Sequence, residues 1–317
     1  MRDFQEYSPE DVILANLSEN SKRSDLLREQ ELAHLSELAL EIASAGELQE
    51  ILAALPDRCP PAIELREDTL AQSKETLVKL HRLLRTQRAI LLSSELCRML
   101  TEQKNLTTES FFTDAEKEKE TKHIRIIYPR SGYADSAYLS FSELFTEAHA
   151  SYTHSFISAC EEVYNGFCDY CILPLENSTE GVLAGFLRLI VRYDLKITAT
   201  CEIQNHSEEK NTQFALLQKT VCPPPLGQRT DLFFSMLLPY TPSDDLSEVM
   251  TAASFFGLTL HTVSFLPHEN VTEPGATYLA FSTPPISLNA FLLYLAMEMP
   301  HYTPIGLYPN IQKKGKT

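Results

Sequence analysis

The sequence lacks any apolar run that approaches the roughly 18 residues needed for a membrane-spanning helix. Its first residues, Met1 to Glu6, are polar and acidic, unlike a signal peptide. Positive charge is also scarce, because 27 Lys and Arg stand against 43 Asp and Glu, for a formal net charge of -16. Nucleic-acid affinity depends on basic side chains that neutralise phosphates. We therefore expect a cytoplasmic protein that binds neither membrane nor nucleic acid.

A disulfide framework is also lacking, because the seven cysteines are odd in number and spread over 317 residues. Cys168 and Cys171 have C-x-x-C spacing, but no second pair stands at the spacing of zinc ligands. Cys171 also falls inside a predicted strand, where a small buried side chain suffices. We predict reduced thiols, no metal site and no cofactor.

What is present is a strand–turn–helix pattern around residues 170–191. Tyr170 to Leu175 is short and apolar, as expected for a buried strand. The next polar residues, Asn177, Ser178 and Thr179, are all helix N-cap types. Apolar residues then recur at helical spacing: Leu183, Phe186, Leu187, Ile190 and Val191. The pattern predicts a helix N-terminus that can bind a carboxylate or phosphate, or else an ordinary capped turn.

Strands and helices alternate around this stretch, which predicts a doubly wound α/β lobe over residues 123–219. The expected elements are a strand at His123–Pro129, a helix at Asp135–Ala148, an extended segment at Tyr152–Phe156, a short helix at Ser158–Asn165, and strands at Lys196–Ile203 and Lys210–Leu217.

The N-terminal third, residues 1–112, reads as an all-helical domain. A helix start is predicted at Ser8-Pro9, with an interruption at Gly46 and a break from Pro56 to Pro61. A long helix is then expected from about Ile63 to Thr101. Residues 113–122 form a charged linker to the lobe.

The C-terminal part, residues 226–311, follows a proline-rich boundary at Val221–Pro225. Its predicted order is β-α-β-β-α-β, which is ferredoxin-like. The expected elements are strands at Asp231–Leu238, Leu258–Phe265, Ala276–Ser282 and Tyr302–Tyr308, and helices at Asp244–Phe256 and Ile286–Met299. The whole chain is thus expected to combine α and α/β domains.

Several of these segments resemble prephenate dehydratases. Pro174 to Gly181, Pro-Leu-Glu-Asn-Ser-Thr-Glu-Gly, is similar to the family signature Pro-x-Glu-Asn-Ser-x-x-Gly. Lys210 to Leu217, Lys-Asn-Thr-Gln-Phe-Ala-Leu-Leu, is similar to the family's Asn-x-Thr-Arg-Phe strand, with Thr212 at the threonine and Gln213 where the family has arginine. Arg229–Ser235 and Ile305–Pro309 look like the family's phenylalanine-sensing ACT domain.

The resemblance implies a lyase of phenylalanine biosynthesis, which converts prephenate to phenylpyruvate with loss of water and carbon dioxide. It implies that Thr212 is catalytic, as donor to the leaving hydroxyl. It assigns Asn177, Ser178 and Thr179 to substrate binding, with Glu176 orienting its neighbours. The implied partners are a small molecule, either prephenate-like or an aromatic amino acid, and further copies of the chain in a homodimer or higher homo-oligomer.

The chain departs from the family at one large gap. Members have a second lobe between the strands that match Lys196–Ile203 and the threonine motif, and their active site lies between the lobes. Here only Gln204–Glu209 intervenes, which spans at most about 20 Å. A second interpretation is therefore a non-catalytic relative that senses a small molecule or binds a partner.

A third interpretation concerns the N-terminal helices, because some prephenate dehydratases carry a helical chorismate mutase there. The basic residues on the long predicted helix do not reproduce the mutase pattern, and a solvated basic face explains them as well. These residues are Arg66, Lys74, Lys79, Arg82, Arg85, Arg88 and Arg98. We assign no mutase activity.

Overall fold

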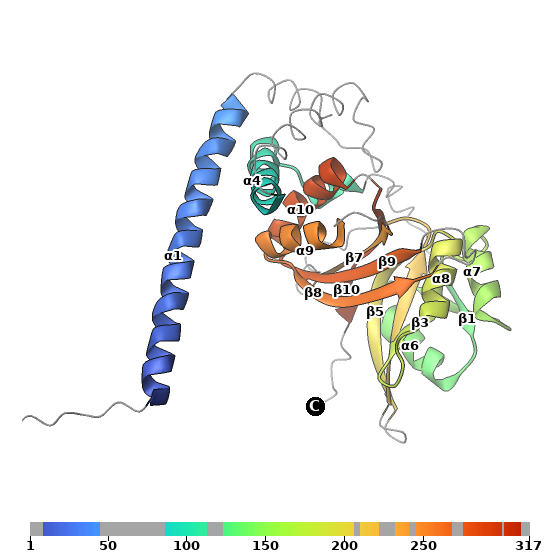
Figure 1. The fold of residues 1–317 in the computed structure, drawn as a ribbon. Coiled ribbons are helices and arrows are strands. Elements are labelled where there is room, and N and C mark those ends of the chain that lie inside the picture. The colour runs from blue at the N-terminus through green and yellow to red at the C-terminus, as the bar shows by residue number, and fades with distance from the viewer. Residues whose placement is uncertain are drawn as a thin grey trace, which may run out of the picture.

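The computed structural model describes residues 9–44, 86–112, 123–205, 210–221, 232–240, 245–267, 275–299 and 301–311 (Figure 1). A long N-terminal helix stands beside a body made of one large sheet with helices packed on it. Among the described helices, none combines the length and the apolar character that crossing a membrane requires.

The N-terminal region is helical, as predicted. The helices are α1 (Pro9–Ser44), α4 (Thr86–Lys104) and the short α5 (Thr108–Phe111). Helix α1 contacts the body where Leu35, 4% exposed, packs on α4, whereas Leu26 and Leu27 are 55% and 58% exposed. The predicted break at 56–61, the first part of the long second helix and the linker at 113–122 lie outside the described residues.

The lobe is doubly wound, as predicted. Its elements are β1 (Ile124–Pro129), α6 (Gly132–Ser142), β2 (Ala148–Thr153), α7 (Phe156–Tyr164), β3 (Tyr170–Asn177), β4 (Gly181–Val182), α8 (Ala184–Arg192), β5 (Lys196–Asn205) and β6 (Lys210–Gln218). Strand β1 is parallel to both β2 and β3, and β3, β6 and β5 then pair antiparallel. Helix α6 covers one face of this sheet, and α7 and α8 cover the other.

One predicted helix of the lobe was too long. The helix expected at Asp135–Ala148 ends at Ser142, and Ala148 already begins β2. The side chains of Leu144 and Phe145 still pack on the α6 side of the sheet. Apolar spacing therefore continued past the helix end because the connecting turn also contributes to the core.

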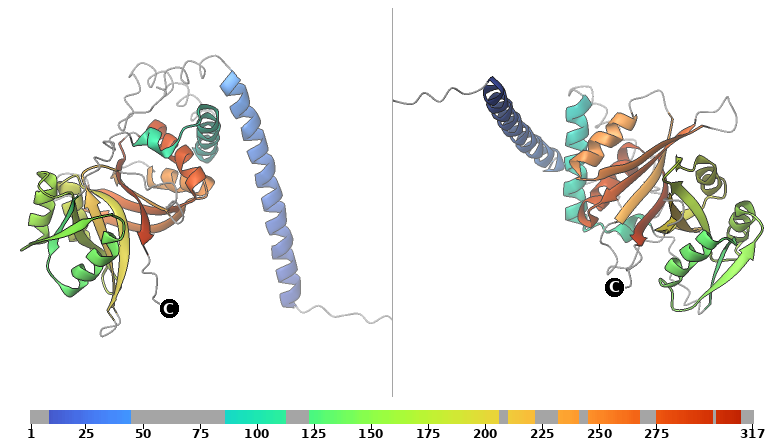
Figure 2. Two further views of the ribbon diagram at one scale, coloured as in Figure 1. Left: turned by 180° about the vertical axis from the view of Figure 1, so that it is seen from behind. Right: turned by 90° about the horizontal axis from the view of Figure 1, so that it is seen from below.

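The C-terminal unit has the predicted ferredoxin-like order. It consists of β7 (Leu232–Pro239), α9 (Asp245–Phe255), β8 (Thr259–Leu266), β9 (Ala276–Thr283), α10 (Pro285–Glu298) and β10 (Thr303–Ile311), with strand order β10-β7-β9-β8. Helices α9 and α10 cover one face of its sheet, and α4 packs on top of them (Figure 2).

Lobe and C-terminal unit share one continuous sheet. Strand β10 pairs parallel with β5 and antiparallel with β7, so the order is β2-β1-β3-β6-β5-β10-β7-β9-β8. The uncovered face of the C-terminal sheet packs against the lobe, where Tyr278 and Ile305 share a core with Leu173 and Leu187. Polar groups on both sides of this boundary are thereby brought together.

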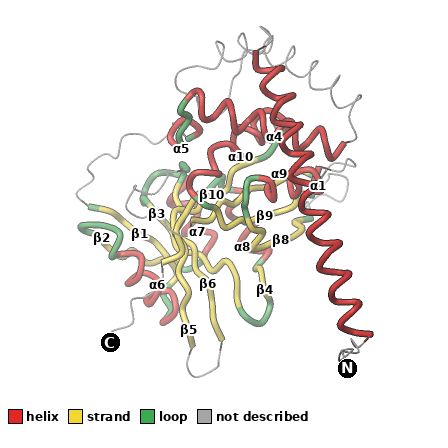
Figure 3. Tube along the Cα trace, turned by 90° about the vertical axis from the view of Figure 1, so that its left-hand side faces the viewer, coloured by secondary structure: helices red, strands yellow, loops and turns green. Residues whose placement is uncertain are grey.

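Strands β5 and β6 form a hairpin, which Figure 3 shows as the longest projection of the sheet. Asn205 lies opposite Lys210 in the register, so residues 206–209 alone join the two strands. A segment of this length reaches about 14 Å at most. The four intervening residues lie outside the described part of the chain, and they are too few to form a second lobe.

Candidate functional site

The signature segment folds as a β-hairpin and not as a capped helix. Strand β3 continues to Asn177, and the chain then turns back through Gly181, which has a φ of 70°, into β4. Helix α8 begins only at Ala184, and no side chain caps it. The predicted helix N-terminus at residues 177–179 is therefore wrong. A glycine in the left-handed region, which suits it better than any other residue, permits the reversal.

Side chains that were predicted to cap a helix hold this hairpin instead. The Asn177 Oδ1 atom accepts hydrogen bonds from the backbone N–H groups of Thr179, at 3.0 Å, and Glu180, at 2.6 Å. The Ser178 Oγ atom accepts from the backbone N–H of Asn211 at 3.1 Å. Thr179 is exposed in the turn. Three of the four predicted substrate-binding residues thus stand on one local turn beside β6.

Thr212 lies next to this turn, because it is directly opposite Asn177 in the β3–β6 register. Both residues are half-buried. The following pair in the register is Glu176 with Gln213. Since successive side chains of a strand point to opposite faces, the predicted residues divide between two faces of the sheet. Thr212 and Asn177 lie on one face, and Glu176 and Gln213 on the other.

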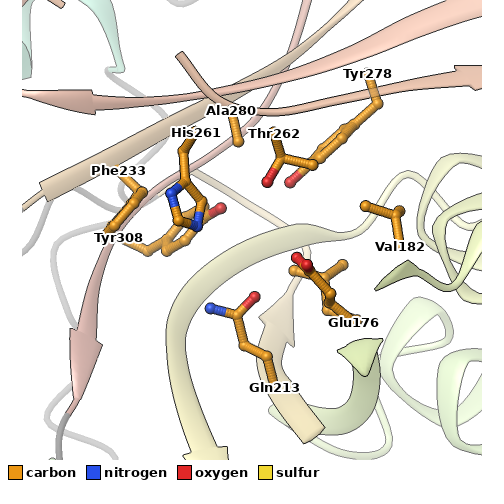
Figure 4. A pocket seen from close by; sticks show the side chains of 10 residues that line it. Glu176, Val182, Gln213, Phe233, His261, Thr262, Tyr278, Ala280 and Tyr308 are labelled. Carbon is orange, nitrogen blue, oxygen red and sulfur yellow. The ribbon is translucent and has the colours of Figure 1, made fainter. Parts of the chain in front are cut away.

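Glu176 and Gln213 face a pocket between the lobe and the C-terminal sheet (Figure 4). We call it the junction pocket; it is lined by Leu175, Glu176, Val182, Gln213, Phe233, His261, Thr262, Tyr278, Ala280 and Tyr308. In Figure 4 the side chains of Glu176 and Gln213 point across it toward His261 and the two tyrosines. The space open to the centre of a water molecule is about 10 Å³, which is what one water needs.

An irregularity in β8 places two polar side chains in the junction pocket. The β8–β9 register shifts between Leu260 and Thr262, as in a β-bulge. His261 and Thr262 therefore both line the pocket, although they are neighbours in a strand. The His261 ring lies 5.1 Å from the ring of Phe233, measured between centroids. Phe233 in turn stacks on Tyr308 at 6.1 Å.

Two tyrosines form the deep wall of the junction pocket. Tyr278 and Tyr308 are 2% and 3% exposed. Burial raises the pKa of Tyr278 well above its ordinary value, and the neighbouring Tyr308 raises it further. Burial is also the main cause that raises the pKa of Tyr308, and the carboxylate of Glu176 adds to the rise of both values. Both phenols therefore stay neutral and can act as hydrogen-bond donors.

Sequence reasoning missed the half of this pocket that the C-terminal unit supplies. A signal was present, because Tyr278 and Tyr308 fall in predicted strands, and a phenol that such a strand buries needs a polar partner. His261 carried no comparable signal, since its direction depends on the bulge. Among the described residues, the group of His and Glu side chains close enough to share a cation is found elsewhere, at the starts of β1 and β2.

The sequence of the lobe matches the model of a known protein family. Residues 124–219 match the family model described as prephenate dehydratase. A search of curated protein sequences finds no match.

Solved structures give similar folds at low identity. A prephenate dehydratase from Streptococcus mutans is 17% identical with a TM-score of 0.50, and the match covers 59% of this chain and 98% of that one. A protein described as GqqA, a novel type of quorum quenching acylase, is 15% identical with a TM-score of 0.47, covering 60% and 95%. The prephenate dehydratase of Arthrobacter aurescens, in complex with L-Phe, is 14% identical with a TM-score of 0.45, covering 59% and 90%.

Proposed function

The chain is a divergent relative of the prephenate dehydratases, and from this premise we propose that it binds a small molecule at the junction pocket as a regulatory protein instead of dehydrating prephenate. The observation that carries the proposal is the direct β5–β6 hairpin, with only residues 206–209 at its tip. Among the described residues, no second lobe is inserted between β5 and β6 to form a wall beside Thr212. A dehydration site needs such a wall, because excluding water strengthens the dipoles that stabilise a leaving hydroxide.

The junction pocket favours an aromatic amino acid as the ligand. The Glu176 carboxylate accepts hydrogen bonds from an ammonium group, and the Gln213 amide and His261 ring can donate to a carboxylate. The rings of Phe233 and Tyr308 offer faces for an aromatic side chain. Since the pocket has room for about one water, an amino acid can enter only when the β3–β4 hairpin moves away from the C-terminal sheet. Occupancy is thereby coupled to the contact between lobe and C-terminal unit.

Thermal denaturation and calorimetry with L-phenylalanine, L-tyrosine, phenylpyruvate and prephenate test this proposal. We expect an aromatic amino acid to raise the melting temperature of the full chain, because it binds the folded state alone. Glu176→Gln should weaken binding about tenfold, which corresponds to roughly 1.4 kcal/mol. Glu180→Gln, on the exposed turn of the same hairpin, is the matched control and should bind normally. If no compound shifts the melting temperature, or both variants bind like the parent, the proposal is wrong.

A second function, prephenate dehydration, is favoured by one observation: Asn177 and Thr212 stand directly opposite each other. In this alternative Thr212 donates to the leaving hydroxyl, and a further chain supplies the missing wall. Purified protein is incubated with prephenate, and phenylpyruvate is followed by its absorbance in alkali against a blank without protein. Product that disappears in Thr212→Ala but persists in Glu180→Gln supports the enzyme and overturns the regulatory proposal. Absence of product from folded protein excludes turnover by this chain alone.

A further inference from the structure

Three side chains gather at the amino-terminal ends of β1 and β2, away from the junction pocket. We call His123, Glu147 and His149 the His–Glu–His cluster. The two carboxylate oxygens of Glu147 contact one histidine each: Oε2 lies 3.2 Å from Nδ1 of His123, and Oε1 lies 3.2 Å from Nε2 of His149. One potential ligand atom from each residue lies within 4.8 Å of the other two. The two imidazole rings are 5.7 Å apart between centroids.

The backbone fixes this arrangement. Strand β1 is parallel to β2, with Ile124 opposite Ala148, so His123 and Glu147 immediately precede a registered pair. The N–H of Ile124 donates to the carbonyl oxygen of Glu147 at 3.2 Å, which ties the two strand starts together. Glu147 and His149 are two positions apart and therefore point to the same side. His149 thus lies in β2, and His123 and Glu147 directly precede the first residues of β1 and β2.

We propose that the His–Glu–His cluster is a binding site for a divalent cation of the Zn²⁺ class. Two imidazoles and one carboxylate are a ligand set that zinc accepts in proteins. A tetrahedral ion with bonds of about 2.0–2.2 Å separates its ligand atoms by about 3.3–3.6 Å. The 3.2 Å contacts between carboxylate and imidazoles are close to that separation. Small rotations of the side chains therefore suffice to admit the ion.

The surroundings suit an accessible site with an open position. The side chains of His123, Glu147 and His149 are 69%, 48% and 55% exposed, so an ion can enter and keep water as a further ligand. A cation, Arg125, lies opposite His149 in the register. The backbone N–H of Arg125 donates to a carboxylate oxygen of Asp169 at 2.8 Å.

The bound ion would join the starts of two strands. Strand β2 is the outermost strand at its end of the sheet, and its far edge has no partner among the described strands. A cation shared by His123, Glu147 and His149 would fix the start of β2 to the start of β1, where the described lobe begins. The site is therefore expected to stabilise the lobe, and it shares no residue with the lining of the junction pocket.

Calorimetric titration of the chelator-treated full chain with Zn²⁺ tests the site. We expect one ion to bind with an affinity that falls at least tenfold in His149→Ala and in Glu147→Gln. His34→Ala is the matched control, because His34 and Glu37 form an exposed His–Glu pair at 3.7 Å without a second described histidine ligand. It should bind Zn²⁺ like the parent. Zn²⁺ should also raise the melting temperature of the parent and not that of the cluster variants.

Two results would overturn the site. One is Zn²⁺ affinity in the cluster variants equal to that of the parent, which assigns any binding to other side chains. The other is absence of binding at micromolar Zn²⁺. Circular dichroism identifies a variant that fails to fold, and Glu147→Gln, which keeps the size of the side chain, then decides. Mg²⁺ in excess should not compete, because it prefers oxygen ligands.

Discussion

At the scale of single residues, Glu95 on α4 is the clearest case of a charge that the fold uses. Its side chain is almost fully buried, with 7% of the residue exposed. It accepts hydrogen bonds from Nε of Arg98 at 2.9 Å and from Oγ of Ser36 on α1 at 3.1 Å. The hydrogen bond from Arg98 is the main cause that lowers the pKa of Glu95. One carboxylate therefore connects α1 to α4.

Replacing Glu95 by Gln should lower the free energy of unfolding at pH 7 by about 1.5–3 kcal/mol, since the lost hydrogen bonds involve charged groups. Because the pKa of Glu95 is lower in the folded than in the unfolded state, the carboxylate stabilises the fold fully at pH values above its unfolded pKa of about 4.3. This stabilisation is lost as the pH falls from there through the pKa of the folded state. Urea unfolding at pH 7 and pH 3 measures this difference. If the free energies of unfolding of the parent and Glu95→Gln differ by the same amount at both pH values, the ionised Glu95 carboxylate does not stabilise the fold as described.

At the scale of elements, Gly306 decides how β10 fits between β5 and β7. It lies opposite Ile197 on one side and Ser235 on the other, and the β10 register shifts next to it in both pairings. A Cβ atom at this position would lie 2.5 Å from the Ile197 carbonyl oxygen and 2.8 Å from the Ile197 Cβ. Only glycine allows the two units to share one sheet at this spacing.

Gly306→Ala should therefore lower the free energy of unfolding by clearly more than a Gly→Ala substitution that only strains the backbone. Gly181→Ala is the matched control, because Gly181 has a positive φ but nothing within 4 Å of an added Cβ. Its cost should be about 1–2 kcal/mol, the ordinary penalty of a left-handed residue. Chemical unfolding of both variants gives the comparison. If Gly306→Ala lowers the free energy of unfolding by less than Gly181→Ala does, strands β5 and β10 can move apart at little cost and this explanation is wrong.

Elements were also the scale at which the sequence was most informative. Alternating apolar runs and helical spacing located the strands and helices of both units, because these patterns reflect neighbours along the chain. The hairpin at Gly181 escaped this reasoning, since asparagine and serine suit a turn as well as a helix cap. The junction pocket escaped it for another reason. Glu176 meets His261 and Tyr278 only because β10 joins β5, and such pairing between distant strands leaves no periodic trace.

At the scale of the whole molecule, the lobe and the C-terminal unit share both a sheet and a core. Leu237, Tyr278 and Ile305 pack against lobe residues such as Leu187. A fragment of residues 226–311 would expose this apolar face to water. We expect the fragment to aggregate or to bind a hydrophobic dye, whereas residues 86–311, which keep α4 packed on α9 and α10, should melt in one cooperative transition. Two separate transitions in calorimetry, or a soluble, folded fragment, would contradict this expectation.

The place of β10 also constrains how the protein emerges from the ribosome. Every other described strand is synthesised before residues 303–311, yet β10 is the strand that lies between β5 and β7. Until it leaves the exit tunnel, the nascent chain holds two half-sheets, each with an unpaired edge toward the other. Open strand edges invite pairing with foreign chains. The interval before β10 appears is therefore the period in which this chain has most need of a chaperone.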